Sequence, residues 1–176
     1  MKKTTPFKAP SDFEKELTDF SNRYKVLLAE HSKRISDYFE MTCYNLVIRY
    51  YEKKGYELDV QNLQAGKFKF KCSPTGQLKN FSYFKATKKG NQGIDEVVYI
   101  FHNATAQSAF DKKVFTTPDI VVANSNIPAE TKDYYVTKKT LSYIPKENLV
   151  TFCEAKHLTV SINRSTYCSY KKLRIP

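Results

Sequence analysis

Tryptophan is absent from this 176-residue sequence, and glycine is scarce. The four cysteines form no CxxC pair and do not have the spacing of zinc ligands, so neither a disulfide framework nor a structural zinc site is indicated. No apolar run approaches the length needed to cross a membrane, and the basic start, MKKTTPFKAPSD, lacks the apolar centre of a signal peptide. Since scattered thiols suit a reducing compartment, the sequence predicts a cytoplasmic protein without membrane contact.

The glycine motifs of three large protein classes are absent as well. The sequence has no GxSxG, GxxxxGK[ST] or GxGxxG pattern, which argues against a serine hydrolase, a P-loop protein and a Rossmann protein. Positive charge, by contrast, is in excess, with 29 Lys and Arg against 18 Asp and Glu and a net charge of +11. This excess favours a polyanionic partner such as nucleic acid, although a merely soluble basic surface gives the same count.

The length predicts a single domain that begins with helices. Residues 1–10 hold two prolines and three lysines and are expected to form a loose arm. Residues 11–55 form the predicted helical segment, which opens on the capping-box letters SDFE and contains no Gly or Pro before Gly55. We expect two helices, divided near residues 31–36, with Gly55 as the C-terminal stop.

Residues 56–176 are expected to form a mixed sheet core with an inserted hairpin. The stretch GKFKFKC alternates strictly, which predicts a strand with Lys67, Lys69 and Lys71 on one face and a return arm in NFSYFKA. The apolar runs in DEVVYIFHN, PDIVVAN and NLVTFCEAK are suited to central strands. The predicted fold class is therefore α/β (α+β), with helices first and a mixed sheet after them.

Charged residues end two of these apolar runs. Asp119 follows Pro118, and Glu154 and Lys156 lie on one face of a strand because side chains alternate along it. Neighbouring strands are about 5 Å apart, so acids at their ends can share a Mg²⁺ ion, which prefers oxygen ligands. A lysine beside that ion can stabilise or help deprotonate an attacking water. The alternative is an ion pair between Glu154 and Lys156 on an edge strand, with Asp119 capping a turn.

The letters PD at 118–119 and EAK at 154–156 match the PD-(D/E)xK signature, so the sequence resembles the restriction-endonuclease-like nuclease superfamily. The resemblance implies a mixed sheet flanked by helices and Mg²⁺-dependent hydrolysis of DNA phosphodiester bonds, with Mn²⁺ as a substitute. It gives Asp119 and Glu154 the role of metal ligands, with the Ala155 carbonyl as a further ligand, and makes Lys156 the helper of the water. The earlier helical acid would be Glu40, since FEMTCYNLVIRYYEKKGYEL looks like the family's first core helix running into its first strand.

Two parts of the chain differ from the family's minimal core. The segment between Gly55 and Pro118 is long, and the sequence after the EAK letters shows no clear amphipathic helix. The chain is then a permuted, shortened or degenerate member, and the resemblance allows a homodimer. The rival interpretations are a catalytically inactive nucleic-acid-binding module and a module whose basic surface binds an acidic protein.

Further polar residues are candidates for contacts with nucleic acid. His102, Asn103 and Gln107 follow a predicted strand and could contact a phosphate or a water, although a polar loop explains them equally well. The lysine face of GKFKFKC, which consists of Lys67, Lys69 and Lys71, could follow a phosphate backbone while nearby aromatic rings stack on bases. A solvated outer face of an antiparallel sheet would give the same alternation.

Overall fold

The computed structural model describes residues 15, 18–19, 22, 35–73, 76–90, 93–131, 140–158 and 165–169, with the backbone alone at 35–38, 156–158 and 165–169. The predicted arm at 1–10, the capping box and most of the predicted division between two helices lie outside these residues. None of the described helices is long and apolar enough to cross a membrane.

Helix α3 (Ile35–Lys53) is the long helix of the described chain, and it ends where the sequence predicts. Gly55 has φ +84°, a conformation that glycine adopts without the steric penalty of a side chain. Its N–H donates to the Glu52 carbonyl at 3.0 Å, and the N–H of Tyr56 donates to the Tyr51 carbonyl at 3.1 Å. These bonds satisfy the last helical carbonyls and turn the chain directly into the first strand.

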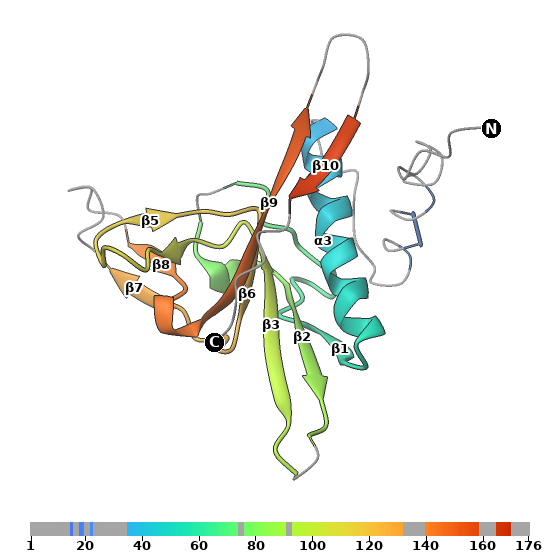
Figure 1. The fold of residues 1–176 in the computed structure, drawn as a ribbon, viewed down its shortest axis with the longest axis horizontal. Helices are drawn as coiled ribbons and strands as arrows, with labels where there is room; N and C mark the ends of the chain where they lie inside the picture. The colour runs from blue at the N-terminus through green and yellow to red at the C-terminus, as the bar shows by residue number, and fades with distance from the viewer. Residues whose placement is uncertain are drawn as a thin grey trace.

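One sheet forms the centre of the molecule (Figure 1). Its order is β1-β2-β3-β6-β9, with β10 added beside β9. The strands are β1 (Glu57–Gln61), β2 (Tyr83–Lys88), β3 (Glu96–His102), β6 (Ile120–Ala123), β9 (Leu149–Leu158) and β10 (Ser165–Ser169). Two short hairpins lie apart from it: β4 (Ala106–Gln107) pairs with β5 (Phe115–Thr116), and β7 (Ala129–Thr131) pairs with β8 (Leu141–Tyr143). Single 3₁₀ turns occur at η1 (Leu78–Asn80) and η3 (Lys146–Asn148).

The structure is α+β, but the sheet differs from the predicted mixed sheet. Every pairing within it is antiparallel. A parallel pair needs a crossover, usually a helix, between its strands, and the described residues between β1 and β9 contain no α-helix. Within the described part of the chain, α3 alone covers the sheet as a long helix, so helices on both sides are not seen there (Figure 1).

The stretch GKFKFKC is not the strand that its alternation predicts. Residues 69–72 belong to no strand, and two hydrogen bonds link the stretch to the return arm. The N–H of Ser82 donates to the Lys69 carbonyl at 2.9 Å, and the N–H of Lys69 donates to Ser82 Oγ at 3.0 Å. Phe68 and Phe70 are buried against α3, as expected for one face. Lys71 is also buried, so the chain does not keep its three lysines on one solvated face.

Apolar clusters cover both faces of the central strands. On the α3 side, Tyr44 packs against Phe68, Phe70 and Phe84 with ring centroids 5.6–6.4 Å apart. On the other side a second cluster contains Phe101, Val121, Ala123 and Ile144. Burial on both faces explains why β6 is the unbroken apolar run IVVA rather than an alternating strand.

Candidate functional site

The two halves of the PD and EAK letters lie side by side where β6 begins. The half-buried Asp119 directly precedes β6, and its Oδ2 accepts a hydrogen bond from the backbone N–H of Ala155 at 2.6 Å. The last opposing pair of β6 and β9 is Ile120 with Cys153, so the next opposing positions are Asp119 and Glu154. Directly opposed side chains of an antiparallel pair are separated by about 4.5–5.5 Å at Cβ. Two acidic residues 35 positions apart in the sequence therefore lie at opposing positions at one end of β6.

The helical acid approaches the same strand end from α3. The side chain of Glu40 is 22% exposed, and its Oε2 accepts a hydrogen bond from Asn103 Nδ2 at 3.3 Å. Asn103 follows β3, and its N–H donates to the backbone carbonyl of Asp119 at 2.8 Å. The sequence places Glu40, Asn103 and Asp119 far apart, and the fold connects them through consecutive hydrogen bonds.

His102 is buried beneath Glu40, between rings of the core. Its ring lies 5.5 Å from the ring of Tyr44 and 5.3 Å from that of Phe70, in edge-on contact with both. Its Nδ1 lies 3.0 Å from the carbonyl oxygen of Lys71 and 3.3 Å from Asn103 Nδ2. The other ring nitrogen, Nε2, lies 3.8 Å from Glu40 Oε2.

Lys71 points into this cluster rather than toward solvent, which corrects its predicted place on an exposed lysine face. Its ammonium donates to the carbonyl of Asn103 at 2.7 Å and to that of Ser73 at 2.8 Å. Burial lowers the pKa of the Lys71 ammonium to about 8, because the interior favours the neutral amine. Its side chain is 2% exposed and cannot follow a phosphate backbone.

The other predicted contacts with nucleic acid have different surroundings. Lys67 is exposed, and the half-buried Lys69 holds its ammonium 5.3 Å from the centre of the Phe81 ring. Gln107 lies in β4, where its side chain donates to the Lys112 carbonyl at 2.9 Å and so braces a loop. His102 and Asn103 are buried with 3% and 7% exposure, so both act inside the protein.

The EAK residues occupy the middle of β9. Glu154 is half-buried and lies between Cys153 and Ala155, which both pack on the α3 side, so period-two alternation directs Glu154 to the opposite face. The backbone of Lys156 pairs with Tyr167 of β10, and its side chain is outside the described residues. Among the described side chains, no three His, Cys, Asp or Glu form a group that could hold a metal ion.

Comparison with protein-family models, with curated proteins and with solved structures found no match to this chain. What can be said of the site comes from its own geometry.

Two residues of the cluster were not recognisable from the sequence as parts of one site. Lys71 belongs to an alternating stretch in which it looks equivalent to Lys67 and Lys69. The sequence presents Asn103 as a polar residue after a strand that could contact a phosphate or a water, and not as a link between two acids. The available signal was the placement of His102 and Asn103 directly after an apolar run. Two polar residues at the end of a buried strand indicate a candidate functional position.

Proposed function

We propose that this protein is a metal-dependent nuclease of the PD-(D/E)xK type that hydrolyses DNA phosphodiester bonds. The observation that carries the proposal is the hydrogen bond from the Ala155 N–H to Asp119 Oδ2 at 2.6 Å. It joins the PD half of the signature to the EAK half, as a shared site requires. The proposal implies a restriction-endonuclease-like fold in which α3 supplies the helical acid and β6 and β9 carry the signature, and it is consistent with a cytoplasmic location.

The residues fit a hard divalent cation. Asp119 and Glu154 occupy opposing positions at the β6–β9 pair, and both are half-buried. Mg²⁺ keeps most of its water and commonly binds through one or two carboxylates, so a pair of acids is a sufficient set. Asp119, Glu154 and the Ala155 carbonyl would hold Mg²⁺ or Mn²⁺, which supplies charge stabilisation at the phosphate and a more acidic bound water.

Lys156 and Glu40 complete the proposed division of roles. Lys156 is two positions after Glu154 in an extended strand, so its side chain leaves β9 on the same face. From there its ammonium would stabilise the charge that develops on the phosphate or assist removal of the water's proton. Glu40 belongs to α3, on the face of the sheet opposite to the one that Glu154 occupies, and would act through Asn103, which links it to Asp119. The net charge of +11 favours DNA as the polyanionic substrate.

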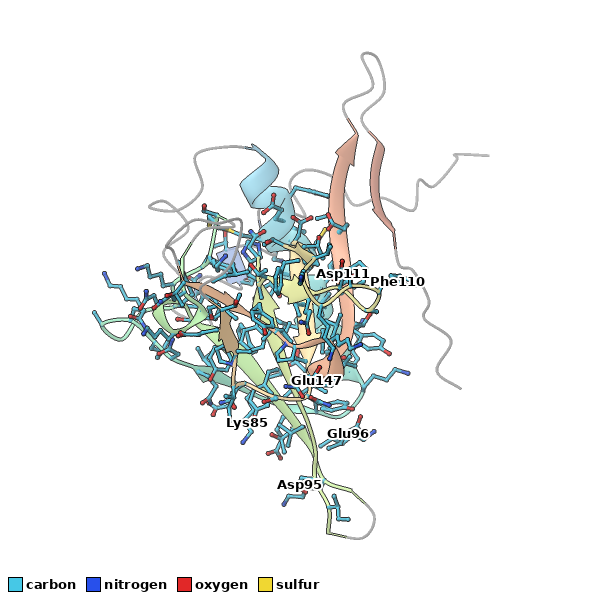
Figure 2. All side chains as sticks on the ribbon, turned by 90° about the vertical axis from the view of Figure 1, so that its left-hand side faces the viewer. Lys85, Asp95, Glu96, Phe110, Asp111 and Glu147 are labelled. Atoms are coloured by element: carbon cyan, nitrogen blue, oxygen red, sulfur yellow. The ribbon has the colours of Figure 1, made fainter. Side chains whose placement is uncertain are left out.

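The proposal is tested by measuring DNA cleavage with Mg²⁺ for the full chain and three variants: Asp119→Asn, Glu154→Gln and Lys156→Ala. Each variant should lose cleavage by about 10²-fold or more. Asp119→Asn is the sharpest of the three, because its amide oxygen can still accept the Ala155 N–H and the fold should persist. Asp95→Asn is the matched control, since Asp95 is exposed near the tip of the β2–β3 hairpin, far from the site (Figure 2).

The outcomes separate the rival functions. Cleavage by Asp119→Asn at the wild-type rate contradicts the assignment of the site. DNA binding by a wild-type protein that never cleaves identifies a binding module instead. A wild type that neither binds nor cleaves DNA favours a protein-interaction role for the basic surface.

A further inference from the structure

Asn103 connects the two acidic sides of the site. Its side-chain Nδ2 donates to Glu40 Oε2 at 3.3 Å, its N–H donates to the Asp119 carbonyl at 2.8 Å, and its own carbonyl accepts from Lys71 Nζ at 2.7 Å. Three of its polar groups thus bind three different segments: α3, the residue before β6, and the stretch 66–73. With 7% exposure, it does so inside the protein.

The backbone conformation at this position restricts which residue can serve. Asn103 has φ +50°, in the left-handed region that most side chains avoid and that Asn, Asp and Gly tolerate best. Of these three, only Asn carries a side-chain N–H that can donate to a carboxylate. The position therefore combines a bend directly after β3 with a side-chain donor that binds Glu40 of α3.

Lys71 and His102 stabilise the backbone at Asn103 through further buried contacts. The ammonium of Lys71 donates to the carbonyls of Asn103 and Ser73, and the carbonyl oxygen of Lys71 lies 3.0 Å from His102 Nδ1. The ring of His102 is fixed by edge-on contacts with Tyr44 and Phe70. A buried, mutually bonded set of this kind leaves the Asn103 amide little freedom to move away from Glu40.

We propose that Asn103 is a positioning residue that fixes the Glu40 carboxylate relative to Asp119. This inference rests on the proposed nuclease function. Catalytic groups must be held within about 0.5 Å of their productive geometry, and outer contacts that orient metal-site carboxylates commonly contribute 10–100-fold to metal affinity or activity. Asn103 supplies such a contact for a residue of α3 and, through its backbone, for the residue that begins β6.

The test is a double-mutant cycle on cleavage, using Asn103→Gly, Glu40→Ala and both together. Glycine tolerates φ +50°, so Asn103→Gly removes the amide while the backbone bonds to Asp119 and Lys71 remain. The single variant should lower kcat about 10–100-fold with KM for DNA changed less than about twofold. In the Glu40→Ala background the same substitution should lower kcat less than about twofold, because the carboxylate that Asn103 positions is then absent.

Asn62→Gly is the matched control. Asn62 also has a positive φ, +55°, and its exposed amide also bridges backbone groups, donating to the carbonyls of Lys79 and Phe81 at 2.8 and 2.7 Å. These contacts lie outside the proposed site. Asn62→Gly should therefore remove two side-chain hydrogen bonds at a positive-φ position, yet leave kcat unchanged.

If Asn103→Gly does not fold, Asn103→Asp tests the positioning role instead. It keeps the size and the tolerated backbone conformation, but it replaces the donor by a carboxylate that faces Glu40. Its kcat should fall at least as far as that of the glycine variant. Wild-type kcat in either folded variant, or equal losses with and without Glu40, overturns the positioning role while leaving the nuclease proposal intact. A wild type that cleaves no DNA overturns both proposals.

Discussion

At the scale of single residues, Lys71 has the most unusual surroundings in the described chain. An ammonium group with 2% exposure is stable only if its hydrogens are bound, and the carbonyls of Asn103 and Ser73 provide two acceptors. Burial lowers the pKa of this ammonium to about 8, because the interior favours the neutral amine. Burying the charged form of Lys71 therefore lowers the free energy of unfolding.

This burial predicts an unusual pH dependence of stability. The folded pKa of Lys71 is about 8 against 10.5 in an unfolded chain, so between these values the unfolded state binds more protons and the free energy of unfolding rises with pH. The full difference corresponds to about 3 kcal/mol as an upper bound. Urea unfolding of wild type and Lys71→Met across this range should show the wild type gaining stability relative to the variant. Parallel curves for the two proteins would mean that the ammonium is not buried as described.

The sequence contained only part of the information about these residues. The PD and EAK letters directed attention to Asp119 and Glu154, and the structure pairs the strands that carry them. Nothing in the letters KFKFKC distinguished Lys71 from Lys67, because the alternation describes a strand and the burial of Lys71 is decided by Asn103, which is 32 positions away. Contacts at that separation are set by topology rather than by local pattern.

At the scale of elements, the runs with the strongest pattern were predicted correctly. The helix that ends at Gly55 is α3, and the apolar runs in PDIVVAN and NLVTFCEAK are β6 and β9. In each of them, consecutive apolar residues or a clear helix stop are enough for the local sequence to determine the type of element. The pairing was not decided locally, because β6 and β9 are joined by a long connection rather than by a tight turn that fixes the register.

The direction of the strands was the feature that the sequence left open. A resemblance to a family with a mixed sheet suggested parallel pairs, whereas the described sheet is antiparallel throughout. Antiparallel pairing has a consequence for the site: the start of β6 lies beside the middle of β9, so Asp119 meets Glu154 and Ala155 there. The site thus depends on the register of one strand pair, which a shift of one residue would destroy.

At the scale of the whole molecule, the charge of +11 determines how the protein meets a polyanion. Each phosphate contacted by Lys or Arg releases condensed counterions, so the logarithm of the affinity for duplex DNA should fall linearly with the logarithm of salt concentration. With several contacts, we expect a loss of about 10³-fold between 50 and 200 mM salt, measured by fluorescence anisotropy in Ca²⁺ to prevent cleavage. An affinity that stays constant over this range would point to a protein partner rather than DNA.

The shared metal site is the claim on which the account depends, and a metal titration of the melting temperature tests it most directly. Two opposed carboxylates repel each other, and an ion that binds both stabilises the folded state by mass action, by about 2.7 kcal/mol at a hundredfold excess over Kd. Mn²⁺ should therefore raise the melting temperature of the wild type and of the control Asp95→Asn equally, and should raise that of Asp119→Asn little. If wild type and Asp119→Asn respond identically at every Mn²⁺ concentration, Asp119 and Glu154 share no metal and the nuclease proposal is wrong.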